Sequence, residues 1–550
     1  MEKPLISLCM IVRNEEQLLP RCLRSVQGAA DEMIVVDTGS SDRTVEIARE
    51  FGAQVIAARW ENDFAAARNI GLEQASGRWI LQLDADEELE RGQHNELRQW
   101  AARSEFDGLL LQVHNHAGSD PGSSVVTINP IVRMFRNYPA CRYKGSIHEQ
   151  IAASILETKP GAAFHCTPIR IHHYGYAAEW VKKKDKVTRN RTLLQEALRR
   201  APDDSFHHYN LAVEYMRVHD YESALRHLRQ SRRFLPGEVS YKHLLYKYEA
   251  YCLSSLARAD EAVKVLDQGR ELYPDYTDLH HTKAVVLIRQ GNKKQAAILL
   301  RRAVRLGPAP LAYHTEAGIG TYQSCFLLGQ LVEEQGSPAE AADYYLQAVT
   351  HNPSMTSAWQ RLFRLMRLEG REQAIARLIF PVLDRLPDGN QPNQARLIRH
   401  VLLLLAEESC LDTARALKEQ YMGSSAGPAV RLNPDFEAQL ASACAAEQPD
   451  DPLVPELPEE WSTAVRAASL SGDNKLAWKL LSGWIEQSKK PDASTKANPS
   501  DHAYRLSLTL IALADIQLAK HGGPESPKRS VIRQARAILP YARLRREDEL

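Results

Sequence analysis

Two aspartates one residue apart stand at the end of an apolar run, and this arrangement suits metal chemistry. Residues 79–83 are largely apolar and lead into Asp84 and Asp86, with Ala85 between them. Side chains two residues apart on a strand share a face, so both carboxylates can point the same way. Such hard oxygen ligands favour Mg²⁺ or Mn²⁺, whose other ligands would be phosphate and water. In the alternative interpretation, the aspartates end a strand and cap the next helix.

The elements that must position these carboxylates alternate between strand and helix. Hydrophobic patterns predict strands at 5–12, 32–37, 53–57 and 79–83. Helices are predicted at 16–27 and 63–75, and a further helix follows Asp37, N-capped by Ser40 or Ser41. This alternation favours an α/β fold with a mostly parallel sheet covered on both faces. Ligands of such sheets bind at the carboxyl ends of the strands, where the three aspartates fall.

Composition and charge exclude several classes of function. The 550 residues contain 69 Lys plus Arg and 69 Asp plus Glu, so no overall charge would attract nucleic acid. The eight cysteines are scattered without zinc-like spacing and indicate reduced thiols of a cytoplasmic protein. No apolar run approaches about 18 residues, and no signal-peptide pattern occurs, so no membrane span or export is expected. The absence of Gly-x-Gly-x-x-Gly and Walker sequences excludes a classical dinucleotide or ATPase site.

Several segments together resemble family 2 glycosyltransferases. They are residues 6–16, 34–44, 67–72 and 79–86, and their order and spacing match that family. The resemblance covers about residues 5–180 and is strongest to the S-glycosyltransferase type, which joins this catalytic domain to tetratricopeptide repeats. It implies a GT-A fold with a Rossmann-like sheet, a nucleotide-sugar donor that is commonly UDP-linked, a divalent metal, and inversion at the anomeric carbon.

The resemblance also implies roles for individual residues. It places six of them around the nucleotide-sugar: Arg13, Asn14 and Glu15 lining the base pocket, Asp37 at uridine, Arg68 near the nucleotide, and Asp84 by the ribose. It places Asp86 on the metal, Mg²⁺ or Mn²⁺. Without the family pattern, Asp37 would only cap the turn after its strand, and Arg68 would be a solvated helix residue.

Direct inversion needs a base that takes the proton of the acceptor. Glu149 is the main candidate, because Gly145 loosens the backbone before the polar pair at 148–149. Asp120, in the Gly/Ser-rich loop 118–124, is the rival candidate. In the structural alternative, Glu149 ends a surface strand and forms an incidental salt bridge.

Two adjacent histidines close the predicted domain. His172 and His173 lie on a predicted strand and therefore point to opposite faces. The resemblance implies a late histidine near the metal or the diphosphate, and we favour His173 for that role over His172. A purely structural histidine is the alternative.

An internal repeat follows the predicted catalytic domain. With the chain aligned on the prolines at 236, 274, 308 and 353, small residues recur in each unit: Ala212, Ala250, Ala284 and Gly329 at one place, and Ala224, Ala262, Ala296 and Ala341 at another. This is the tetratricopeptide pattern, which predicts an all-α superhelix. The predicted organisation is a catalytic domain at 1–180, a linking helix at 181–204, repeats at 205–387, and degenerate helical repeats at 388–550.

The inner helices of such repeats offer a groove for a polypeptide. The predicted groove positions are Tyr209, Arg217, Lys247, Tyr251, His281 and Arg289. This mixture suits a peptide or protein acceptor. As alternatives, the repeats mediate formation of a homodimer or act as a spacer.

Three functions fit these observations. The first is an inverting glycosyltransferase that modifies a peptide or protein held by the repeats. The second applies the same catalysis to a cell-envelope glycan or a lipid-linked acceptor. The third is a repeat scaffold with an inactive catalytic domain, against which the intact Asp37, Asp84, Asp86 and Glu149 argue.

Overall fold

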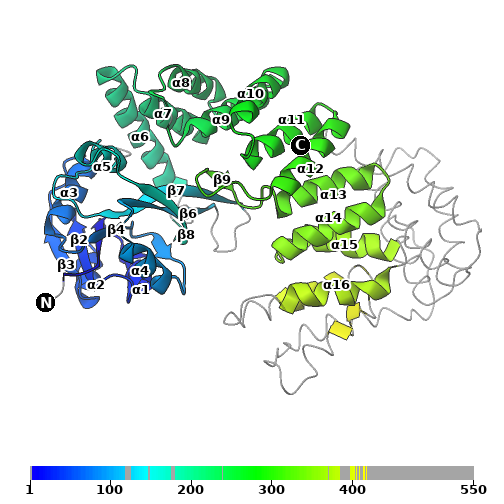
Figure 1. The fold of residues 1–550 in the computed structure, drawn as a ribbon, viewed down its shortest axis with the longest axis horizontal. Helices are drawn as coiled ribbons and strands as arrows, with labels where there is room; N and C mark the ends of the chain where they lie inside the picture. The colour runs from blue at the N-terminus through cyan, green and yellow to red at the C-terminus, as the bar shows by residue number, and fades with distance from the viewer. Residues whose placement is uncertain are drawn as a thin grey trace, which may run out of the picture. The chain divides into compact units, whose positions relative to one another are not determined.

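The computed structural model describes residues 3–103, 105–117, 125–145, 149–174, 180–237, 239–368 and 371–384, together with parts of 397–417. Asp120 and the predicted degenerate repeats beyond residue 417 lie outside the described residues. The chain divides into two compact units, Met1–Gly320 and Thr321–Leu550. The first unit carries the sheet and the first helix pairs (Figure 1).

The first half of the sheet is parallel and agrees closely with the predicted strands. β1 (Ile6–Val12) pairs with β2 (Glu32–Asp37) and β4 (Trp79–Gln82), and β2 pairs with β3 (Gln54–Ala57). Every residue of β4 is buried, which explains why its sequence is nearly continuously apolar. The order β3-β2-β1-β4 puts the carboxyl ends of β1, β2 and β4 side by side. These are the strands that precede the predicted site residues.

The helices of this half are α1 (Leu19–Val26), α2 (Thr44–Glu50) and α3 (Phe64–Gln74). Asp63 caps α3 by accepting a hydrogen bond from the Ala66 N–H at 2.9 Å, so this helix begins where the sequence predicts. α1 begins later than predicted, at Leu19 instead of residue 16. Pro20 stands in its first turn, where the missing N–H removes no helical bond.

The prediction that Ser40 or Ser41 caps α2 is wrong. This helix begins at Thr44, and its N-cap residue makes no capping side-chain hydrogen bond. The Asp37 carboxylate accepts a bond from the Ser40 N–H at 3.1 Å, and Asp42 accepts one from the Thr44 N–H at 3.0 Å. Carboxylates therefore organise the turn in place of the predicted serine cap.

The second half of the sheet is mixed. Its strands are β5 (Glu87–Leu89), β6 (Gly108–Ala117), β7 (Val125–Arg136), β8 (Phe164–His173) and β9 (Thr315–Glu316). The nine-stranded order is β3-β2-β1-β4-β7-β6-β8-β5, with β9 also on β7. β6 and β8 are parallel, whereas the pairs β4–β7, β6–β7, β5–β8 and β7–β9 are antiparallel. The α/β class is confirmed, and its parallel, Rossmann-like part runs from β1 to β4.

Helices pack around and beyond this sheet. α4 (His94–Ala102) and α5 (Ala152–Thr158) belong to the sheet domain, and α6 (Trp180–Arg200) follows it in the chain. The helices that follow are α7 (Ser205–Arg217), α8 (Tyr221–Arg233), α9 (Lys242–Ser255), α10 (Ala259–Leu272), α11 (Thr277–Arg289) and α12 (Lys293–Leu306). The predicted small positions in these helices are completely buried: Ala212, Ala224, Ala250, Ala262, Ala284 and Ala296. The helical-repeat prediction is therefore confirmed in this part of the chain.

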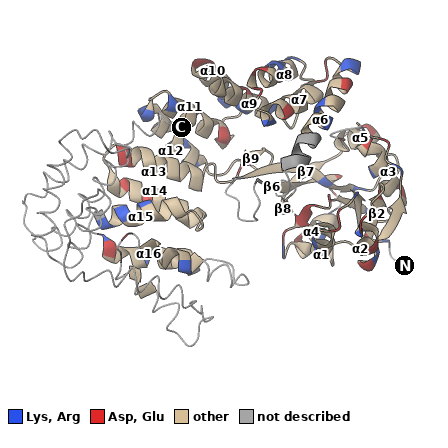
Figure 2. Ribbon diagram, turned by 180° about the vertical axis from the view of Figure 1, so that it is seen from behind, with Lys and Arg blue, Asp and Glu red and all other residues tan. Residues whose placement is uncertain are grey.

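The second unit continues with helices. They are α13 (Tyr322–Glu334), α14 (Pro338–His351), α15 (Thr356–Leu368) and α16 (Glu372–Asp384). Gly329 is required for close packing here, since a Cβ at this position would lie 2.7 Å from the Tyr345 ring. Acidic and basic residues are interspersed along the helices (Figure 2). In the part of the chain that the structure describes, no helix is both long enough and apolar enough to cross a membrane.

Candidate active site

The loop after β1 lies against the loop after β2. Asn14 adopts a left-handed backbone conformation, with φ of 56°. Its N–H donates to Ser40 Oγ at 2.9 Å, and its Oδ1 accepts from the Ser41 N–H at 2.8 Å. The Glu15 N–H donates to Thr44 Oγ1 at 2.7 Å. These bonds bring the predicted base-pocket segment, residues 13–15, to the loop that follows Asp37.

Asp37 is buried at the end of β2 and is only 7% exposed. Its carboxylate accepts hydrogen bonds from the backbone N–H groups of Gly39, at 3.2 Å, and Ser40. The structure therefore shows the turn-capping role that the sequence offers as the plain interpretation. A carboxylate has about four acceptor positions, so this role leaves capacity for a ligand donor.

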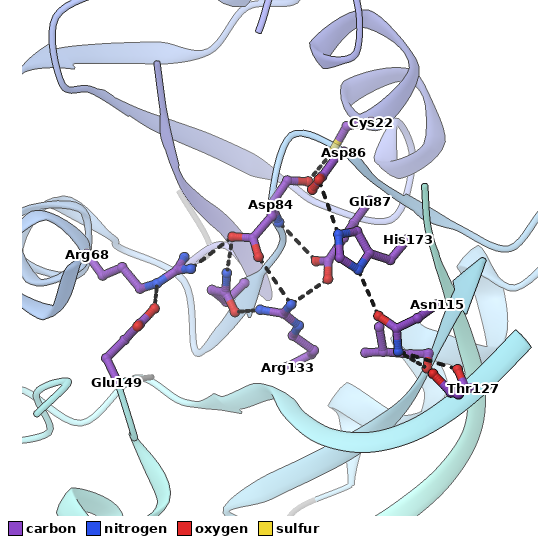
Figure 3. Close-up of polar contacts among 12 residues, drawn as sticks. Cys22, Arg68, Asp84, Asp86, Glu87, Asn115, Thr127, Arg133, Glu149 and His173 are labelled. Atoms are coloured by element: carbon purple, nitrogen blue, oxygen red, sulfur yellow. Dashed lines mark hydrogen bonds and ion pairs between the residues drawn. The ribbon is translucent and has the colours of Figure 1, made fainter. Parts of the chain in front are cut away.

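An arginine joins two of the predicted site carboxylates. Arg68, from α3, donates from Nη2 to Asp84 Oδ1 at 2.9 Å and from Nε to Glu149 Oε1 (Figure 3). The Arg68 and Glu149 side chains are 10% and 13% exposed, so neither is a solvated surface residue. Sequence positions 68, 84 and 149 thus meet in one place. Asp120, the rival to Glu149, lies outside the described residues.

A second arginine, which was not predicted from the sequence, completes this centre. Arg133 on β7 donates to Asp84 Oδ2 at 3.3 Å and also binds Glu87 and Gln82. Gln82 in turn donates to Asp84 Oδ1 at 3.1 Å, and the Asp84 N–H donates to Glu87 Oε2 at 2.9 Å. Asp84 is therefore held from several directions, so its orientation is set before any ligand binds.

These charges shift the protonation equilibria of the centre. Burial acts to raise the pKa of the Asp84 carboxyl, but the positive charges of Arg68 and Arg133 hold that pKa well below its usual range. Burial raises the pKa of the Glu87 carboxyl, and the positive charge of Arg133 acts to lower it. Asp84 therefore remains an anion at every physiological pH.

Asp86 points away from this centre toward β8. Its Oδ2 lies 3.1 Å from Nε2 of His173, whose Nδ1 lies 2.8 Å from Asn115 Oδ1 (Figure 3). Burial acts to lower the pKa of His173, but its hydrogen bond with Asp86 raises that pKa above the usual value. Asp84 and Asp86 therefore serve separate networks, and the expectation that both carboxylates point the same way is not met.

The Asp86–His173 pair has a geometry that a divalent metal can use. With metal–ligand distances of 2.0–2.1 Å, neighbouring ligands of an octahedral ion lie about 3 Å apart, close to the separation of these two donor atoms. A metal would replace the proton that the pair now shares. Among the described residues, no third His, Cys, Asp or Glu side chain completes a cluster with them. The remaining ligands would come from a diphosphate and water, as is common for Mg²⁺.

His172 faces the other side of the strand, as the alternation of strand side chains predicts. Its Nε2 lies 2.9 Å from Glu90 Oε2, and its Nδ1 lies 2.9 Å from Nε2 of His116. His114 lies beside this group, and burial lowers its pKa to about 4. His172 thus belongs to a histidine cluster that does not include Asp86, so the geometry favours His173 at the metal.

Four residues of the site were not predicted from the sequence: Gln82, Glu87, Asn115 and Arg133. The position of Glu87 directly after the acidic pair was its signal in the sequence, and the structure shows that its side chain is only 1% exposed. Arg133 stands between Val132 and Met134 in an apolar strand, which is unusual for a charge without a buried partner. Asn115 gave no signal, because its role depends on pairing between β6 and β8.

Comparison with known proteins agrees with this architecture. Residues 7–169 match the model of the glycosyl transferase family 2, and residues 253–309 match that of a tetratricopeptide repeat. The chain joins a family 2 glycosyltransferase domain to tetratricopeptide repeats. The glycosyltransferase match spans β1 to β8 and ends in the strand that carries His173.

Several relatives share parts of this chain. A TPR repeat-containing protein of Synechococcus elongatus is 39% identical over 41% of this chain and 56% of its own length. The SPbeta prophage-derived glycosyltransferase SunS of Bacillus subtilis is 26% identical over 52% of this chain and 68% of its own. An uncharacterized glycosyltransferase of Rickettsia prowazekii is 38% identical over 32% of this chain and 63% of its own. The chain thus spans between about half and two thirds of these relatives.

Solved structures are more distant. The crystal structure of S. aureus TarS is 15% identical, with a TM-score of 0.27, over 47% of this chain and 53% of that chain. MamA is 15% identical, with a TM-score of 0.27, over 32% of this chain and 94% of that chain. Likeness at this level carries no argument about function.

Proposed function

We propose that this chain is an inverting glycosyltransferase that transfers a sugar from a UDP-linked donor to a peptide or protein acceptor. The observation that supports it most is the meeting of Arg68, Asp84 and Glu149, next to the Asp86–His173 pair, in a family 2 domain. The loops that carry Asn14 and Asp37 adjoin one another at the carboxyl ends of β1 and β2, where α/β sheets bind ligands.

In this proposal, Asp84 contacts the ribose from an orientation fixed by Arg68 and Arg133. Arg13, Asn14, Glu15 and Asp37 surround the base. Two buried donors, Arg68 Nη1 and Tyr143 Oη, have no hydrogen-bond partner in the described part of the chain. An unpaired buried donor costs about 1–3 kcal/mol, so the centre favours a ligand or water that supplies acceptor oxygens.

Asp86 and His173 would hold Mg²⁺ or Mn²⁺. When bound, the metal would neutralise charge on the leaving diphosphate as a Lewis acid. The His173–Asn115 hydrogen bond fixes the imidazole ring, and such a bond to the second ring nitrogen tunes a metal-binding histidine.

Glu149 is proposed as the base that accepts the proton of the acceptor. Arg68 occupies its Oε1, which fixes the carboxylate and leaves Oε2 to face the acceptor. A fixed carboxylate is a more effective base, because it is already oriented toward the acceptor. It takes the proton of the acceptor in the same step in which the acceptor bonds to the sugar.

The acceptor is proposed to contact exposed residues in the C-terminal halves of the inner repeat helices. Arg217 and Arg289, the last residues of α7 and α11, are exposed, as is Tyr251 in the C-terminal half of α9, which reaches 48%. Lys247 and His281, two other predicted groove positions, are only 5% and 8% exposed. The prediction that these two contact a peptide partner is therefore wrong, and the reason is an internal segment described below.

The proposal is tested with a panel of nucleotide-sugars. The chain is incubated with UDP-sugars and with GDP- and TDP-sugars as comparison, with Mn²⁺ or with excess chelator, and released nucleotide is measured. We expect release from at least one UDP-sugar, only with metal. Equal release in chelator would contradict the metal role, and no release from any donor would contradict the enzymatic proposal.

Replacing Glu149 with glutamine is expected to lower sugar transfer by at least about 10²-fold, the usual contribution of a positioned base. Binding of UDP should persist, since the amide keeps an oxygen that can accept the Arg68 bond. The measurements are initial rates of transfer and UDP affinity by calorimetry. Glu157→Gln is the matched control, because Glu157 pairs with Lys144 at an exposed site. Near wild-type transfer by the Glu149 variant would remove it as the base.

A further inference from the structure

The connection that follows α12 lies against the inner helices α9 and α11. The Tyr276 hydroxyl donates to the His314 carbonyl at 2.7 Å, and the His314 N–H donates to Nε2 of His243 at 3.1 Å. The Tyr313 ring packs 4.9 Å from the rings of both His243 and Tyr276. The repeat surface that was expected to hold a foreign peptide thus holds a segment of its own chain.

A charge network centred on the buried Lys247 and Asp278 holds this segment. Lys247 Nζ lies 2.6 Å from Asp278 Oδ1 and 2.7 Å from Glu316 Oε1. Asp278 is completely buried and also accepts from Thr315 Oγ1 at 2.5 Å and from the Glu316 N–H at 3.3 Å. Displacing the segment would remove Glu316 and Thr315 from the buried Lys247–Asp278 pair, so this network stabilises the segment on the repeat helices.

The other side of the same segment extends the catalytic sheet. Thr315 and Glu316 form β9, which pairs antiparallel with Ile128 and Thr127 of β7 (Figure 1). The Ala317 N–H donates to the Val126 carbonyl at 2.8 Å. β4 pairs with β7 further along the strand, at residues 134–136. β7 therefore contacts β9 near its beginning and β4 near its end.

A short chain of hydrogen bonds leads from β9 to the metal pair. Thr127, the partner of Glu316, accepts from Asn115 Nδ2 at 3.4 Å through its carbonyl. Asn115 Oδ1 lies 2.8 Å from His173 Nδ1, and His173 Nε2 lies 3.1 Å from Asp86 (Figure 3). The amide of Asn115 therefore touches both the strand that β9 secures and the imidazole of the site.

We propose that residues 314–317, here called the brace, are a positioning element of the catalytic domain that the repeats supply. The brace holds β7 at Thr127, and Asn115 transmits that position to His173, so that the imidazole faces Asp86. The effect of the brace on catalysis rests on the proposed function, whereas its role in holding β7 does not. The first repeats thereby influence the position of His173 whether or not an acceptor is bound.

Ala317→Pro tests the brace selectively. Proline removes the N–H that bonds Val126 but leaves the groove contacts of His314 and Glu316, and the extended conformation of Glu316 is compatible with a following proline. We expect faster amide hydrogen exchange in 108–117 and 125–129. We also expect Mn²⁺ affinity, titrated by electron paramagnetic resonance, to fall about 10–100-fold, the usual effect of disturbing the support of a metal ligand.

Two further variants keep the test decisive. Tyr313→Phe removes only the exposed bond to Asp275 at 3.0 Å and should change neither exchange nor Mn²⁺ affinity. Asn115→Ala removes the hydrogen bond between Asn115 and His173, so it should weaken Mn²⁺ binding without altering hydrogen exchange in 314–317. This variant tests the link to His173 even if Ala317→Pro does not fold.

If the Ala317→Pro variant folds and shows wild-type hydrogen exchange and wild-type Mn²⁺ affinity, the brace does not position β7 and the proposal is wrong. Unchanged Mn²⁺ affinity in Asn115→Ala would overturn the link to His173. If the wild type releases no nucleotide from any donor, the proposed function fails, but the exchange experiment still decides whether the brace secures β6 and β7.

Discussion

Replacing Asp86 with asparagine is expected to lower metal-dependent release of UDP by at least about 10³-fold. Metal Lewis-acid catalysis contributes several kcal/mol to such a transition state, and each 1.4 kcal/mol corresponds to about tenfold in rate. The amide cannot supply the anionic oxygen that now lies 3.1 Å from His173. The measurement is the rate of release across a Mn²⁺ titration, with thermal melting to show that the variant is folded.

The chain offers a matched control for this variant. Glu90 is paired with His172 at 2.9 Å in the same way that Asp86 is paired with His173, but on the other face of β8. Glu90→Gln should therefore keep most of the activity. If both variants lose activity equally, or if Asp86→Asn retains it, Asp86 is not the metal ligand.

Replacing Arg133 with methionine is expected to lower the free energy of unfolding by about 3–5 kcal/mol. The Arg133 and Glu87 side chains are 11% and 1% exposed, so the change would leave the Glu87 charge buried without its cation. Asp84 would keep Arg68 but lose its second guanidinium. The measurement is chemical denaturation of the variant and the wild type under the same conditions.

Two comparisons show whether the buried pair causes this loss. Arg43→Met removes an exposed partner of Glu46, with side-chain exposures of 65% and 67%, and should change stability by less than about 1 kcal/mol. The double variant Arg133→Met, Glu87→Gln removes the stranded charge and should be more stable than Arg133→Met alone. A single variant as stable as the Arg43 control would contradict the role of Arg133.

The parallel half of the sheet was predictable because β1, β2 and β4 are largely buried and therefore appear as apolar runs. Asp37, Asp84 and Asp86 follow such runs directly, so their place at the strand ends could be inferred. The contacts of these residues could not be inferred in the same way. Asp84 turns to the arginines and Asp86 to β8, because β4 ends at Gln82 and the aspartates lie in the turn beyond it.

The mixed half was not predictable, because its strands are defined by long-range pairing. Arg133 and Asn115 acquire their roles only when β7 lies between β4 and β6. β9 has two residues, Thr315 and Glu316, inside a stretch that shows no strand pattern. A helical repeat motif identifies the helices on either side of such a segment, but it gives no information on the connection between them.

The pairing of Thr127 with Glu316 has a consequence for biosynthesis. These residues are about 190 positions apart, so at roughly 5–20 residues per second the ribosome adds Glu316 about 10–40 s after Thr127. During that interval, the edge of β7 that later pairs with β9 has no partner strand there, although its other edge pairs with β6, and unpaired strand edges promote aggregation. A nascent or truncated chain that stops before β9 therefore exposes this edge, and we expect such chains to depend on chaperones more than the full chain does.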